Sequence, residues 1–160
     1  MGQIHCTNGG SLSALISLFK NKFLFGTKEM TIWFSPLYFR LQNGLLQTSR
    51  MDALVADTIH ICSWGNIDWI HDRLDMNLGL PADTLKSAFG IDPLPREYVL
   101  KIPISGSTQN PKLATGTALA KIAALLAAQK TPHKLSNGIL NIFTQSDADV
   151  PPPNHPFPWE

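Results

Sequence analysis

A strict alternation of side chains constrains the fold of this sequence more than any other feature. Between residues 73 and 81, large apolar side chains occupy every second position: Leu74, Met76, Leu78 and Leu80. Successive side chains of a β-strand point to opposite faces, so this run predicts a strand with one buried face and one wet face. That pattern is typical of an antiparallel sheet.

Runs of the same period occur around residues 37–42, 59–62, 66–69 and 98–104. Asn43-Gly44 follows the first of them, and this pair is the strongest short signal for a type I′ hairpin turn. The stretch from Leu45 to Ala56 has mixed parity and predicts a β-bulge. We therefore expect a mainly β protein of the α+β class, an antiparallel β-meander or trough that is open on one apolar face.

Three segments have helical spacing. The first lies near residues 11–20, after the N-cap candidate Ser11. The second covers 82–89, where Pro81 precedes the helix and Gly90 suits its C-cap. The third covers 114–129, with Leu119, Ile122 and Leu126 as its apolar stripe, which Ala118 and Leu125 widen.

These elements divide the chain into three parts. Residues 1–28 form an N-terminal helix and linker, and residues 29–130 form the β-meander with its C-terminal helix. Residues 131–160 form a polar tail with five prolines between positions 151 and 158. Prolines at that density favour a disordered or polyproline II segment.

Composition narrows the function classes. The charged fraction is 16% and the net charge is +1, without any run of like charges. A nucleic-acid binder needs a basic stripe, so we expect no nucleic-acid partner. No apolar run reaches the roughly 20 residues of a transmembrane helix, and the first residues do not resemble a signal peptide. The sequence therefore carries no targeting signal.

The best candidates for chemistry are His60 and Cys62, which share the outward side of one predicted strand. A Cys–His nucleophile pair or half of a metal site is one interpretation of them. An exposed polar sheet face is the other, and we favour it because HExxH, CxxC, GxGxxG and GxSxG motifs are all missing. We therefore expect no enzyme, with no catalytic residues, no metal site and no cofactor. The two cysteines, Cys6 and Cys62, are expected to be reduced thiols.

The order of several short motifs resembles the C-terminal region of AsmA-like proteins of the bacterial envelope. The motifs lie between residues 30 and 130: Phe39-Arg40-Leu41-Gln42-Asn43-Gly44-Leu45-Leu46, Trp64-Gly65-Asn66-Ile67-Asp68, Arg73-Leu74-Asp75-Met76-Asn77-Leu78-Gly79-Leu80, Tyr98-Val99-Leu100-Lys101-Ile102-Pro103-Ile104-Ser105-Gly106-Ser107 and Asn110-Pro111-Lys112. The AsmA and TamB superfamily consists of long β-sheet troughs with an apolar interior, which are implicated in phospholipid transport between membranes and in outer-membrane assembly.

The resemblance implies a periplasmic or membrane-associated place in the cell envelope, for a truncated or C-terminal piece of such a protein. It implies a lining that contacts phospholipid or other acyl chains. By parity, that lining consists of Phe39, Leu41, Ile59, Ile61, Ile67, Trp69, Leu74, Met76, Leu78, Leu100, Ile102 and Ile104. Periodicity alone leaves two alternatives open, a lipid groove and a core sealed by the 114–129 helix. A structural or interaction module, docking on a membrane surface or an envelope protein without binding lipid, is the alternative function.

Overall fold

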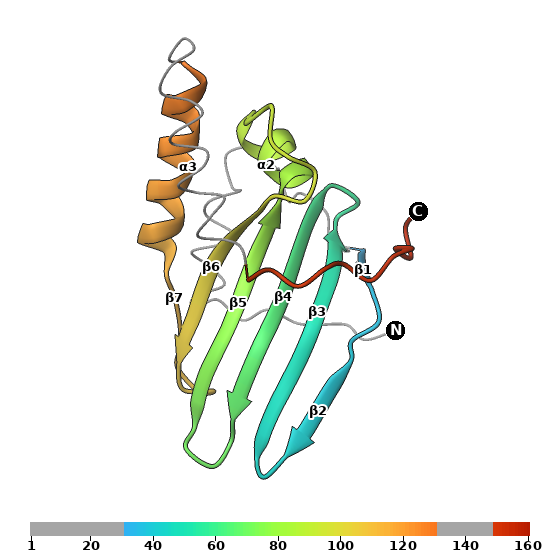
Figure 1. The fold of residues 1–160 in the computed structure, drawn as a ribbon, viewed down its shortest axis with the longest axis vertical. Helices are drawn as coiled ribbons and strands as arrows, with labels where there is room; N and C mark the ends of the chain where they lie inside the picture. Colours follow the sequence, from blue (N-terminus) through green and yellow to red (C-terminus); the bar gives the residue numbers. More distant parts are fainter. Residues whose placement is uncertain (1–30, 131–148) are drawn as a thin grey trace.

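A computed structural model describes residues 31–130 and 149–160 of the chain. The helix expected near residues 11–20 and Cys6 lie outside these ranges. The described strands are β1 (Ile32–Phe34), β2 (Phe39–Gln42), β3 (Leu45–Val55), β4 (Ile59–Asp68), β5 (Arg73–Pro81), β6 (Val99–Gly106) and β7 (Pro111–Leu113). They form one sheet of 7 strands in the order β1-β3-β4-β5-β6-β7, and β2 also pairs with β3 (Figure 1).

The sheet is antiparallel throughout and does not close into a barrel, which confirms the expected fold class. Asn43 and Gly44 have φ values of 50° and 76°, as a type I′ hairpin between β2 and β3 requires. The register of β3 against β4 shifts between Thr48 and Met51, so the predicted bulge is confirmed. Pro36 lies between β1 and β2, which share the same edge of β3.

The strand register decides which side chains share a face. Met76 pairs with Gly65 on β4 and with Ile104 on β6, so the side chains of these partners lie on the same side. We call this side the apolar face. Every lining residue that lies within a strand belongs to it: Phe39, Leu41, Ile59, Ile61, Ile67, Leu74, Met76, Leu78, Leu100, Ile102 and Ile104. The opposite side, which we call the polar face, carries His60, Cys62 and Trp64.

Helices α2 (Ala82–Phe89) and α3 (Thr115–Gln129) match the predicted positions. Gly90 caps α2 in the left-handed conformation, with φ of 69°. Gln129 at the end of α3 donates hydrogen bonds to the carbonyls of Gly90 and Asp92, which joins the two helix ends. No helix in the described part of the chain is both long and apolar enough to span a bilayer.

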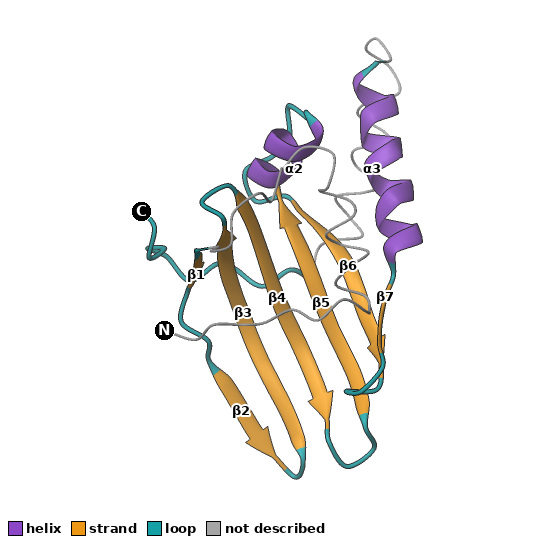
Figure 2. Ribbon diagram, turned by 180° about the vertical axis from the view of Figure 1, so that it is seen from behind, coloured by secondary structure: helices purple, strands orange, loops and turns teal. Residues whose placement is uncertain are grey.

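The core lies where both helices pack on the apolar face (Figure 2). Its fully buried side chains include Leu80, Leu85, Leu100, Ile102 and Leu125. The predicted stripe of α3 was partly wrong. Leu119 is 49% exposed, whereas Ile122 and the two residues that widen the stripe, Ala118 and Leu125, are buried in the core as expected. The Ala-rich sequence offers several overlapping apolar faces, so packing against β6 selects one of them.

Residues 149–160, which we call the proline-rich segment, are the described part of the tail for which the sequence predicts disorder or polyproline II. The segment contains no helix or strand, yet it crosses β5, β4 and β3 on the polar face (red in Figure 1). Val150 packs on a small apolar cluster of Cys62, Trp64 and Val99. Proline prevents ladder hydrogen bonds but does not prevent side-chain packing, so the segment can contact the sheet without joining it.

Gly65 tests the strand register, because the backbone of β5 lies very close to β4 at this residue. Its φ is +140°, and a Cβ at this position would lie 2.3 Å from the Asp75 carbonyl oxygen. Gly65→Ala should therefore lower the free energy of unfolding by about 3 kcal/mol or more. Urea denaturation followed by far-ultraviolet circular dichroism measures the change. Gly116→Ala is the matched control, because nothing lies within 4 Å of its Cβ position and alanine favours the helix. Equal stabilities of the two variants would contradict the register.

Candidate functional site

The lining predicted from parity falls into two halves of the apolar face. Ile59, Leu100 and Ile102 are buried to 5%, 0% and 1% exposure in the core beneath α2 and α3. Ile61 and Leu78 are half-buried against the same core. These residues form the closed half, and they belong to the sealed core that the sequence left as an alternative. The prediction that these five residues line an accessible surface was wrong, because α2 and α3 cover them.

The rest of the lining lies away from the helices and forms the open half. Phe39 and Leu41 on β2 are 66% and 55% exposed. Next to them along the sheet come half-buried side chains from the four strands β3 to β6: Leu46, Ile67, Leu74, Met76 and Ile104. An apolar surface of this kind that stays accessible to solvent marks an interaction site.

Trp69 differs from the other lining residues because it follows the end of β4 rather than lying within a strand. It is 56% exposed, and its backbone N–H donates to the Gly44 carbonyl over 2.9 Å. Ile70, which is 68% exposed, lies over Gly44, where a Cβ would meet its Cγ1 at 2.5 Å. The β2–β3 and β4–β5 turns are thus joined at the sheet end far from the helices (Figure 1). Trp69 and Ile70 expose large apolar side chains there.

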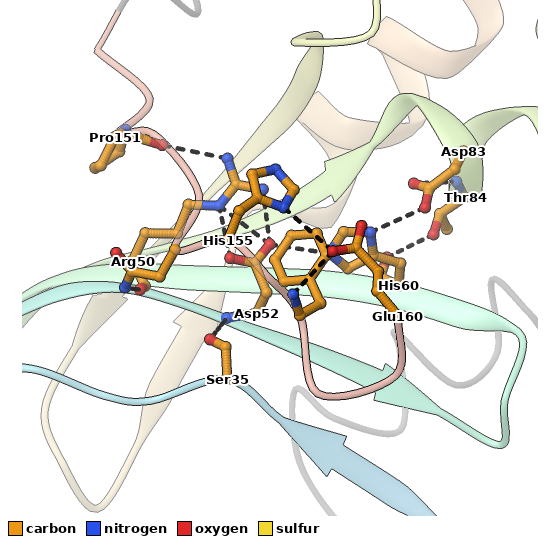
Figure 3. A network of polar contacts seen from close by, with 11 residues as sticks. Ser35, Arg50, Asp52, His60, Asp83, Thr84, Pro151, His155 and Glu160 are labelled. Carbon is orange, nitrogen blue, oxygen red and sulfur yellow. Dashed lines mark hydrogen bonds and ion pairs between the residues drawn. The ribbon is translucent and has the colours of Figure 1, made fainter.

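The polar face contains a cluster of charged residues that the sequence did not predict, in which Arg50, Asp52 and His60 are buried and Asp83 is exposed (Figure 3). Asp52 is fully buried, and its carboxylate accepts hydrogen bonds from Arg50 at 2.7–3.1 Å. His60 Nε2 lies 2.9 Å from the same carboxylate, and its Nδ1 lies 2.9 Å from the Asp83 carboxylate on α2. We call Arg50, Asp52, His60 and Asp83 the ionic cluster.

The two carboxylates decide the charge of His60. Burial alone would lower the pKa of the imidazole, but the hydrogen bonds to Asp52 and Asp83 outweigh burial and raise its pKa to about 9. Burial would likewise raise the pKa of Asp52, yet hydrogen bonds from His60 and Arg50 hold it below its usual range. At neutral pH the cluster therefore carries two positive and two negative charges, each paired.

Cys62 neighbours the ionic cluster, and burial raises the pKa of its thiol to about 12. A thiol that stays protonated at neutral pH is a poor nucleophile. His60 and Cys62 do share one side of β4 as predicted, but the expectation of an exposed polar face was wrong there. They are 7% and 1% exposed because the proline-rich segment covers them. Among residues 31–130 and 149–160, no group of three or more His, Cys, Asp and Glu side chains is placed to hold a metal ion.

A weak sequence signal for the ionic cluster existed. Asp52 stands on a strand beside Met51, Ala53, Leu54 and Val55, where a carboxylate has to be paired once the strand is buried on both faces. The sequence did not show which cation pairs with it. Arg50 lies two residues before Asp52 on β3, so the two side chains share one side, and the register shift between Thr48 and Met51 turns that side to the polar face.

Comparisons with protein-family models, with curated proteins and with solved structures find no match to this chain. The two faces of the sheet and the motif resemblance therefore carry the functional argument.

The ionic cluster predicts how stability depends on pH. The pKa of His60 is raised in the folded state, so its stabilisation is complete below pH 6.5 and disappears as the pH rises through about 9. The two lowered carboxylate pKa values act oppositely, stabilising above about pH 4 and losing that effect in acid. We expect the free energy of unfolding to fall by about 3 kcal/mol between pH 6.5 and 10.

Urea denaturation at a series of pH values measures this dependence. His60→Gln should remove most of the alkaline loss, because glutamine does not titrate. His71→Gln is the matched control, since His71 is exposed and pairs with Asp68 across a turn. An alkaline loss of the same size in His60→Gln as in the parent would contradict the assignment.

Proposed function

We propose that this chain is a non-catalytic module that holds the acyl chains of phospholipid against the open half of its apolar face. The exposure of Phe39, Leu41 and Trp69 is the observation that carries the proposal, because each is more than half exposed on or beside a face that is otherwise apolar. Large apolar side chains cost free energy when water covers them, and this cost disappears when hydrocarbon replaces the water.

The chemistry of the open half fits hydrocarbon rather than a polar ligand. Its side chains are aliphatic, aromatic and thioether groups, with Thr48 as a polar member. Thr48 is already engaged, because its hydroxyl donates to the Gly65 carbonyl over 3.1 Å. Each methylene group of an acyl chain that leaves water contributes about 0.8 kcal/mol, so a short contact along these strands is enough to hold a chain.

Trp69 and Ile70 suggest where lipid meets the sheet. Tryptophan prefers the boundary between headgroups and hydrocarbon, because its ring is apolar and its N–H is polar. Both residues are exposed and lie in the turn between β4 and β5, at the sheet end opposite α2 and α3 (Figure 1). We therefore propose that this end faces a membrane surface and that acyl chains extend from it along the open half.

The motif resemblance supports the cellular setting. AsmA-like proteins act in the bacterial envelope, so we propose an envelope-associated, periplasmic role in phospholipid transport or outer-membrane biogenesis. The module needs neither a metal nor a cofactor for that role, and the proposal includes no reaction.

A second candidate is an interaction module that binds no lipid. It is favoured by the sheet edge formed by β1 and β2, where Trp33, Phe34 and Tyr38 are 45%, 48% and 62% exposed. An edge strand exposes backbone donors and acceptors to another chain, and exposed aromatic side chains strengthen such pairing. In this candidate the open half contacts a protein surface.

Lipid recovery tests the first candidate. The parent chain, purified from cells without detergent, should yield phospholipid on solvent extraction and mass spectrometry. Leu41→Glu and Met76→Glu place a carboxylate in the open half, so we expect about a fivefold or greater loss of bound phospholipid with the fold retained. Gln47→Glu is the matched control, because Gln47 lies on the polar face of β3 and is exposed.

Ile102→Glu serves as a second control, for a lining residue that lies in the sealed core. Ile102 is 1% exposed beneath the helices, so a carboxylate there should unfold the chain rather than remove lipid selectively. Equal phospholipid in the parent, Leu41→Glu and Met76→Glu would contradict the acyl-chain site. A lipid-free parent that forms stable oligomers through the β1–β2 edge would favour the second candidate.

A further inference from the structure

The proline-rich segment lies on the polar face in the manner of a bound peptide. Arg50 Nη1 donates to the Pro151 carbonyl over 3.2 Å, and Asn154 Nδ2 donates to the Arg50 carbonyl over 3.2 Å. Both hydrogen bonds involve one residue of β3, and the described segment adds no strand to the sheet. Side chains and single carbonyls, rather than a backbone ladder, therefore hold it in place.

The aromatic end of the segment has its own contact. The rings of Phe157 and Trp159 stack on each other with centroids 4.7 Å apart and 13° between their planes. Each ring also meets the His60 ring edge-on, with centroids 5.2 and 5.5 Å away. A protonated imidazole at that distance attracts aromatic rings, so the positive charge of His60 contributes to holding the pair.

The surface beneath the segment is ordered by contacts that do not involve the segment. Asp52 holds Arg50 and His60, Asp83 holds the other ring nitrogen of His60, and the Thr84 hydroxyl donates to the His60 carbonyl. Ser35 on the edge of β3 donates to and accepts from the backbone of Asp52. Such a preorganised surface costs little ordering when a peptide binds.

The polar face also has an apolar cluster, Cys62, Trp64 and Val99, against which Val150 of the proline-rich segment packs. We call the segment in this position the cover, because it shields the cluster from water. Gly79 makes room for the cluster, since a Cβ there would lie 2.5 Å from both Cys62 Sγ and Val99 Cγ1. If the proline-rich segment leaves, these side chains meet water, and another segment with the same chemistry gains by replacing it.

From these contacts we propose that the polar face is a peptide-binding surface for a proline-rich partner segment with a paired Phe and Trp, and that residues 149–160 occupy it in competition with that partner. Prolines suit the role because polyproline II is preformed and loses little entropy on binding. This inference is independent of lipid binding, which concerns the opposite face.

Cys62 reports on the cover, since it is buried under the segment. In a Cys6→Ser background it is the remaining thiol, and its rate of reaction with an aromatic disulfide reagent measures how often the cover opens. Phe157→Ala combined with Trp159→Ala should raise this rate at least about tenfold while the far-ultraviolet spectrum stays the same. Tyr38→Ala removes an exposed aromatic ring on the β2 side of the sheet and should leave the rate unchanged.

A synthetic peptide with the sequence of residues 149–160 then tests binding. Added to the double variant, it should restore the slow rate in a saturable manner, and the same peptide with alanine at both aromatic positions should not. If the double variant unfolds, Asn154→Ala replaces it, because that change removes one hydrogen bond to the Arg50 carbonyl.

An unchanged Cys62 rate in both variants, or no protection by the peptide, would overturn the proposal. Dimers that form with rising concentration without binding of free peptide would also overturn it, since a second copy would then be the occupant.

Discussion

The register of β4, β5 and β6 is the constraint on which the rest of the structure depends. Gly65, Met76 and Ile104 lie side by side, and this pairing places the lining residues of all these strands on one face. A slip of one residue would turn Leu74, Met76 and Leu78 to the other side. The close approach of β4 to β5 at Gly65 leaves no space for a side chain, so the register is specified sterically as well as by hydrophobic burial.

The two faces of the sheet are completed in different ways. On the apolar face, α2 and α3 seal the half around Leu100 and leave the half around Phe39 open. On the polar face, the ionic cluster and the proline-rich segment cover β3 and β4. Buried charges have to be paired, so Arg50, Asp52 and His60 fix one arrangement of that face.

Much of the fold could be predicted from the sequence. Alternation located the strands, Asn43-Gly44 located a hairpin, and Pro81 with Gly90 bounded α2. Parity also predicted correctly that the lining residues within strands share one face of the sheet. It did not show that Ile59 and Ile102 are sealed, because coverage by helices is a long-range property. The ionic cluster was missed for the same reason, since Arg50, His60 and Asp83 come from three elements and meet only after the sheet and α2 assemble.

The central claim is that acyl chains lie against the open half of the apolar face, and tryptophan quenching tests it most directly. Trp69 stands beside that half at 56% exposure, whereas Trp64 is 7% exposed on the polar face. Two chains that each keep one of these tryptophans, with the others changed to Phe, are mixed with phosphatidylcholine brominated on its acyl chains. The account predicts strong quenching of Trp69 and little quenching of Trp64. Equal quenching of both, or none of Trp69, would contradict it.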